Sequence, residues 1–110
     1  MVKHAIERFT MYENLLPIGS IVALSKLNKR VMIVGRIQAR EGDDRIFDYS
    51  GCYYPDGIIS SRSMLFFDAD DVEALFFVGY QDKEELDFRS KILANLDELQ
   101  IVDGKIVPVE

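Results

Sequence analysis

The chain is organised around one stretch, Phe47-Asp48-Tyr49-Ser50-Gly51-Cys52-Tyr53-Tyr54-Pro55-Asp56-Gly57. This stretch holds three of the five tyrosines and the only cysteine. Aromatic residues alternate in it with small or acidic ones, and it ends in a Pro-Asp-Gly sequence. Proline fixes one φ angle of a tight turn, and glycine accepts a positive φ. The pattern therefore predicts a strand, Ile46–Tyr54, that leads into a turn, with Phe47 and Tyr49 in the core.

Apolar runs on both sides of this stretch predict the other strands of an antiparallel sheet. Ile21–Leu24 and residues 31–37 are joined by a short basic turn and fit a hairpin. Residues 31–37 are apolar on both faces, which is typical of a central strand. Gly35 inside this run predicts a bulge or a close backbone approach. Residues 64–67 and 74–80 supply two further strands.

Two acidic segments predict helix starts. Asp68, with Asp71 three positions later, favours a single helical turn that ends at Val72 or Glu73. Asp82 favours a full helix over residues 82–100. The apolar stripe of that helix would be Phe88, Ile92, Leu96 and Leu99.

The two ends of the chain complete the predicted organisation. Residues 1–14 fit an N-terminal helix or a flexible arm, residues 15–81 form a β-rich core, and residues 101–110 form a terminal hairpin around Asp103-Gly104. A length of 110 residues is that of one domain. We expect an α+β fold with a small, strongly bent antiparallel sheet, or an SH3-like barrel, of about five strands. One C-terminal helix would pack against it.

The charge of the chain is uneven. Residues 1–40 carry seven Lys/Arg and two Asp/Glu, whereas residues 41–110 carry six and seventeen, and the net charge is −6. An acidic surface repels nucleic acid and anionic membranes, and suits a basic protein partner or plain solubility. There is no apolar run of about 20 residues, the length that spans a bilayer, and residues 1–8 lack the apolar core that a signal peptide has. We expect a cytoplasmic protein with no membrane insertion, and we do not expect nucleic-acid binding.

The residues that could carry chemistry are few. Cys52 could be a nucleophile, but it needs a base nearby, and the only histidine is His4 in the N-terminal arm. A small strand residue is the commoner role for such a cysteine. One cysteine and one histidine cannot build a zinc site without carboxylates. The sequence therefore predicts no catalytic residue, no metal site and no cofactor.

The acidic residues also have simpler explanations than chemistry. The cluster of Asp68, Asp70, Asp71 and Glu73 lacks the glycine and the glutamate of a calcium loop, so helix capping is favoured. Asp56 fits a turn residue. Asp48 is an acid inside an aromatic strand, which leaves two alternatives: exposure on the solvent face, or an arginine partner.

Several ordered motifs carry a family resemblance. The segments are Leu16-Pro17-Ile18-Gly19-Ser20-Ile21-Val22-Ala23-Leu24, Val31-Met32-Ile33-Val34-Gly35-Arg36, the stretch 47–57, Leu65-Phe66-Phe67 with the turn at 68–72, and Phe76-Phe77-Val78-Gly79-Tyr80-Gln81-Asp82. Together they resemble domain of unknown function family 4176, over about residues 15–90.

The resemblance implies a biological setting. Members of this family occur in Gram-positive bacteria, often encoded beside LXG toxins of the type VII secretion system. That context implies a non-enzymatic accessory protein, an adaptor or chaperone that binds the toxin or another export-locus protein. The alternatives are a toxin immunity protein and a small enzyme that uses Cys52. No catalytic residues come with the family.

The predicted partner-binding residues are Tyr53, Tyr54, Asp56, Arg36 and Tyr80. Tyrosine offers a large, rigid contact area with a polar tip, which is why it gathers at interfaces. Tyr53 and Tyr54 lie beside the predicted turn and are therefore expected at the surface.

Overall fold

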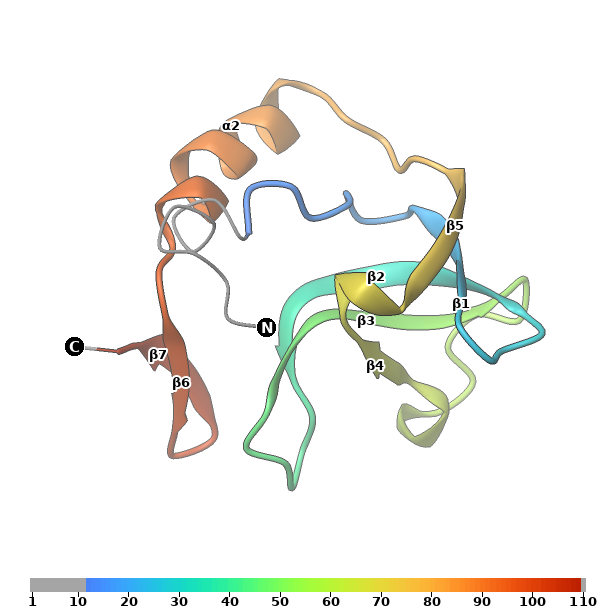
Figure 1. Ribbon diagram of the computed structural model, residues 1–110, viewed down its shortest axis with the longest axis horizontal. Helices are drawn as coiled ribbons and strands as arrows, with labels where there is room; N and C mark the ends of the chain where they lie inside the picture. The colour runs from blue at the N-terminus through green and yellow to red at the C-terminus, as the bar shows by residue number, and fades with distance from the viewer. Residues whose placement is uncertain (1–11, 110) are drawn as a thin grey trace. The chain divides into compact units, whose positions relative to one another are not determined.

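Five strands form an antiparallel sheet in the computed structural model, which describes residues 12–109 (Figure 1). The strands are β1 (Ile21–Leu24), β2 (Arg30–Ala39), β3 (Ile46–Tyr54), β4 (Leu65–Phe67) and β5 (Val72–Phe77). Their order across the sheet is β4-β3-β2-β1-β5. The predicted α+β class and the central place of β2 are confirmed. Of the two predicted forms the open sheet is found: β4 and β5 stand at opposite ends of the order, so the sheet does not close into a barrel.

The described residues form two compact units. The sheet unit comprises residues 16–38 and 47–80, and the helical unit comprises residues 12–15, 39–46 and 81–109. The single domain expected from the length stays a prediction. The predicted N-terminal helix or arm lies outside the described residues up to residue 11, and residues 12–14 form a turn before Leu15.

Buried side chains of the sheet unit come from both faces of β3. Strand alternation places Phe47 and Tyr49 on one face and Ser50 and Cys52 on the other, and all four are buried. The ring of Tyr49 lies 5.4 Å from that of Phe67, and the ring of Phe47 lies 5.8 Å from that of Phe66. The expected core places of Phe47 and Tyr49 are therefore confirmed. The buried apolar side chains are Val22, Leu24, Val31, Ile33, Phe47, Tyr49, Cys52 and Phe67.

The segment before β1 is locked to the segment after β5. The fully buried hydroxyl of Ser20 donates to the carbonyl of Pro17 at 2.8 Å and accepts from the backbone N–H of Gly79 at 3.0 Å. A Cβ at Gly79 would lie 2.0 Å from the carbonyl oxygen of Ile18. β5 was predicted over residues 74–80, and it ends earlier because Gly79 leaves the ladder to meet this backbone.

Asp48 makes two hydrogen bonds that the sequence did not predict. Its carboxylate accepts from the backbone N–H of Ala69 at 2.8 Å, and its own N–H donates to Asp68 at 3.0 Å. Both contacts hold the 3-10 turn Ala69–Asp71. The helical turn predicted there is found, but it ends at Asp71, because Val72 and Glu73 already belong to β5. Asp48 is therefore a structural residue that joins β3 to the connection between β4 and β5.

β2 is distorted in its second half. A Cβ at Gly35 would lie 2.4 Å from the hydroxyl oxygen of Ser50, so the predicted close approach is found, but to side chains rather than backbone. Two residues later, Ile37 has a φ of 57°. This is an unfavourable value for a β-branched residue. The side-chain amide of Gln38 accepts from Ser50 at 3.1 Å and donates to the carbonyl of Ile37 at 3.3 Å, and so holds the distortion.

The helix of the helical unit is shorter than predicted. α2 spans Lys83–Lys91, and the side chain of Asp82 caps it by accepting from the N–H of Glu85 at 3.0 Å. The prediction of residues 82–100 is wrong, because a 3-10 turn, Leu93–Asn95, follows and Asn95 donates to the carbonyl of Lys91 at 2.8 Å. The expected apolar stripe is not a buried face. Leu93, which flanks it, is the buried residue.

A terminal hairpin follows the helix, as predicted. It consists of β6 (Leu99–Val102) and β7 (Lys105–Pro108). The turn residues Asp103 and Gly104 have φ angles of 53° and 76°. Positive φ at both central residues is the geometry that an Asp-Gly hairpin turn supplies.

Candidate partner-binding surface

The turn after β3 has the predicted geometry. The Tyr54–Pro55 peptide bond is cis, and Gly57 has a φ of 80°. The N–H of Gly57 donates to the carbonyl of Tyr53 at 2.9 Å, which closes the turn. Tyr53 is half-buried and Tyr54 is exposed. The two tyrosines and Asp56 therefore lie together at one end of the sheet.

Lys29, from the connection between β1 and β2, joins this group. Its Nζ lies 2.6 Å from Oδ1 of Asp56 and 5.7 Å from the ring centroid of Tyr53. The hydrogen bond from Lys29 holds the pKa of the Asp56 carboxyl below its ordinary value. Because both groups are reached by solvent, this ion pair contributes little to stability. Its role is to fix the position of the turn against the neighbouring connection.

Two isoleucines extend the apolar part of this surface. Ile58 and Ile59 follow the turn directly, outside any strand, and Ile59 is 75% exposed. Exposed apolar side chains beside polar ones are typical of protein contact sites. We name this group the β3 turn surface, and its members are Lys29, Tyr53, Tyr54, Asp56, Ile58 and Ile59.

The structure separates the other predicted site residues from this surface. Arg36 is half-buried in β2, seven positions after Lys29. At the rise of an extended strand this is roughly 20 Å along the sheet. Tyr80 follows β5 and is 80% exposed. Only Tyr53, Tyr54 and Asp56 of the predicted set lie together, and a role in partner binding stays a prediction for all five.

Sequence reasoning missed three members of the surface. Lys29 lies in the basic connection between β1 and β2. That this connection meets the tyrosine-rich turn after β3 could be inferred only once the strand order was known. Ile58 and Ile59 carried a direct signal, because two adjacent isoleucines after Gly57 lie where no strand was predicted.

Cys52 does not have the environment of a reactive cysteine. Its side chain is buried, at 2% exposure. Burial, and next the charge of Asp56, raise the pKa of the Cys52 thiol. A nucleophilic cysteine needs the opposite shift, toward the thiolate. His4 lies outside the described residues.

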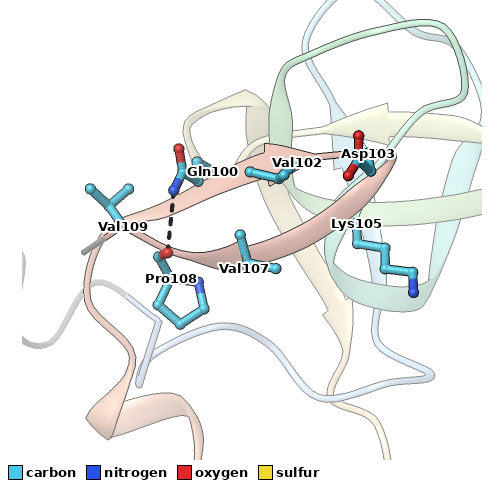
Figure 2. A pocket seen from close by; sticks show the side chains of 7 residues that line it. All are labelled: Gln100, Val102, Asp103, Lys105, Val107, Pro108 and Val109. Atoms are coloured by element: carbon cyan, nitrogen blue, oxygen red, sulfur yellow. Dashed lines mark hydrogen bonds between the residues drawn. The ribbon is translucent and has the colours of Figure 1, made fainter.

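The terminal hairpin carries an open hollow on one face (Figure 2). Its apolar lining comes from Val102, Val107 and Val109. Gln100 donates from its side chain to the carbonyl of Pro108 at 3.4 Å, while Asp103 and Lys105 lie at the turn. A ligand pocket usually has polar groups that converge on its centre. This hollow has its charged groups at one end, so it does not resemble such a pocket.

Among residues 12–109 no three His, Cys, Asp or Glu side chains are grouped so as to hold a metal ion. Within the same residues, no helix has the length and apolar character needed to cross a membrane.

The fold is thus that of an α+β protein with exposed aromatic and apolar side chains grouped at the β3 turn surface. Residues 15–88 match the family described as Domain of unknown function (DUF4176), and the chain belongs to that family. No curated protein matches the chain, and no solved structure does.

The motifs of the family resemblance lie in the framework of the sheet unit. The hydroxyl of Tyr49 accepts from the N–H of Leu16 at 2.8 Å. Ser20, Pro17 and Gly79 are joined by the hydroxyl of Ser20. These residues therefore have a structural explanation, which does not require a role in function.

Proposed function

We propose that the protein is a non-enzymatic accessory factor that binds another protein, as adaptor or chaperone. The partner we propose is an LXG toxin of a type VII secretion system, or another protein of the same export locus, bound in the cytoplasm. The setting is the one that the family resemblance implies. The observation that carries the binding role is the β3 turn surface.

The side chains of this surface support a contact role. Tyr54 and Ile59 offer apolar area that can be removed from water without disturbing the buried core. The ion pair between Lys29 and Asp56 places polar groups beside them, as in the polar rim of an interface. The closed turn holds the tyrosines in place, so less side-chain and loop ordering would oppose binding.

Co-expression with the neighbouring toxin, followed by pull-down, tests the proposal. We expect a stable complex, and we expect Tyr54→Ala combined with Ile59→Ala to weaken it at least tenfold, about 1.4 kcal/mol. Val102→Ala combined with Val109→Ala is the matched control, because it removes exposed apolar area from the terminal hairpin instead. Absence of a complex with every protein of the locus would overturn the proposal.

The same experiment separates an adaptor from an immunity protein. The toxin is expressed as its LXG export domain and as its catalytic domain. An adaptor or chaperone binds the export domain. Binding to the catalytic domain, with protection of cells by this chain alone, would instead support the immunity alternative.

A further inference from the structure

β5 is an end strand of the sheet. In the described part of the chain it pairs with β1 on one side only. An end strand presents a row of backbone N–H and C=O groups that another strand can use. Its outer edge is therefore a place where a strand could be added.

The side chains of β5 do not protect this edge. Leu75, Phe76, Phe77 and Val78 form a continuous exposed apolar run, with Phe77 at 58% exposure. Lysine, proline and β-bulges are among the features that guard an edge strand. β5 contains neither lysine nor proline, and its only charged residue is Glu73.

The strand is anchored at both ends, while its pairing with β1 has two register shifts, between Ile21 and Val22 and between Ala23 and Leu24. The N–H of Ser25 donates to the carbonyl of Asp71 at 3.0 Å at one end, and the N–H of Gly79 donates to Ser20 at 3.0 Å at the other. Between them, the guanidinium of Arg30 lies 4.4 Å from the ring centroid of Phe76. An edge fixed in this way is preorganised, which lowers the cost of adding a strand.

The charges around β5 indicate the chemistry of that strand. Residues 68–80 contain no lysine or arginine and four carboxylates: Glu73 in β5, and Asp68, Asp70 and Asp71 in the turn just before it. Arg30 adds a positive charge beside Phe76. A second copy of the chain would bring four more carboxylates to the same edge. A strand with lysine or arginine near Glu73 and the start of β5 would face these carboxylates favourably, since opposite charges across a strand pair stabilise it.

We propose that the β5 edge binds an extended partner segment in which apolar residues alternate with lysine or arginine. The segment adds a sixth strand to the sheet. Main-chain hydrogen bonds give the affinity of such a pairing, and alternate side chains give its specificity. The inference rests on the proposed function in one respect: the segment belongs to the partner proposed above. The edge itself can be tested without that partner.

The probe is a capped peptide of alternating valine and lysine, about nine residues long, the length of an ordinary strand. Added to the isotopically labelled full chain, it should shift the NMR signals of Val72–Phe77 and slow exchange of their amide protons. A peptide with glutamate in place of lysine should bind at least about tenfold more weakly. A peptide with alternate backbone nitrogens methylated should not slow exchange, because it lacks the donors.

Phe77→Lys is the matching change in the protein, since lysine is what guards natural edges. It should weaken binding of the lysine peptide at least about tenfold, whereas Val109→Lys after the terminal hairpin, also at an exposed apolar residue, should leave it unchanged. Circular dichroism of both variants checks that the fold is kept. Peptide binding that is unchanged in Phe77→Lys, or NMR shifts confined to other strands, would overturn the inference. So would a homodimer of this chain that Phe77→Lys dissociates, because the edge would then belong to a second copy.

The result is independent of the toxin pull-down. A complex that forms with toxin while the peptide does not bind leaves the proposed function standing and removes the β5 edge from it. Peptide binding without any toxin complex supports the β5 edge as a binding site and counts against the proposed function.

Discussion

The two end strands of the sheet, β4 and β5, differ in length and in the exposure of their side chains. β4 has three residues, and its Phe67 is buried against Tyr49. β5 has six residues, and five of them are exposed. A very short edge strand leaves few backbone groups for an outside strand, whereas a longer apolar one invites pairing. We therefore expect β4 to contribute to the stability of the fold, and the outer edge of β5 to be available to another strand.

The largest expected effect compares one phenylalanine from each edge. Phe67→Ala should lower the free energy of unfolding by about 4 kcal/mol, because it leaves a cavity beside the Tyr49 ring. Phe77→Ala should lower it by less than about 1 kcal/mol, because Phe77 is already largely in water. Urea denaturation of both variants measures the two values. Equal losses would mean that β5 is packed as tightly as β4.

The next largest effect concerns the anchor of β5. In Gly79→Ala the new Cβ would meet the backbone of Ile18, so we expect a loss of about 3 kcal/mol in unfolding free energy. Gly57→Ala is the control, because Gly57 has open space around it and its cost is only that of a positive φ, about 1 kcal/mol. A Gly79→Ala variant no less stable than Gly57→Ala would contradict the close approach.

A smaller effect tests the hydrogen bond at the same anchor. Ser20→Ala leaves the N–H of Gly79 without its acceptor in a buried site, which should cost about 2 kcal/mol. The hydroxyl of Ser25 is exposed and bonds Asp71 weakly, at 3.4 Å, so Ser25→Ala should change stability by less than about 0.5 kcal/mol. Thermal denaturation of both variants, side by side, checks the difference.

The smallest effect lies at the turn after β3, away from the anchor of β5. Because Lys29 lowers the pKa of Asp56 in the folded chain below 3.8, the pair favours folding above that pH. The contribution is lost as the pH falls through the lower, folded pKa. The stability difference between the wild type and Asp56→Asn should therefore shrink below about pH 4, and peptide binding at β5 should be the same in both. A constant difference down to the lowest pH would argue against the ion pair.

Local patterns in the sequence were sufficient for the strands that alternate or run continuously apolar. β3 has the bounds that its aromatic alternation predicts, and the Asp-Gly pair places the terminal turn correctly. The length of α2 could not be read in the same way. Leu99 satisfies a helical stripe and a strand equally, and in the structure it begins β6.

Features that depend on strand order could not be predicted from local patterns. The apolar run at residues 74–80 predicts a strand, but its place at an end of the sheet and the exposure of five of the six residues of β5 could not be predicted from it. The contact of Lys29 with Asp56 depends on which connections meet at one end of the strands. Likewise, Asp48 finds its partners twenty residues further along the chain.

The hydrogen bond between Ser20 and Gly79 spans 59 positions of the chain. Pairings between distant residues form later than local ones, because a long loop must close first. β1 to β4 follow one another closely and can assemble while the rest of the chain is still being made. β5 must then return across them to reach β1. We therefore expect the strand with the most exposed edge to join the sheet last, and the edge of β1 to be unprotected on the nascent chain until it does.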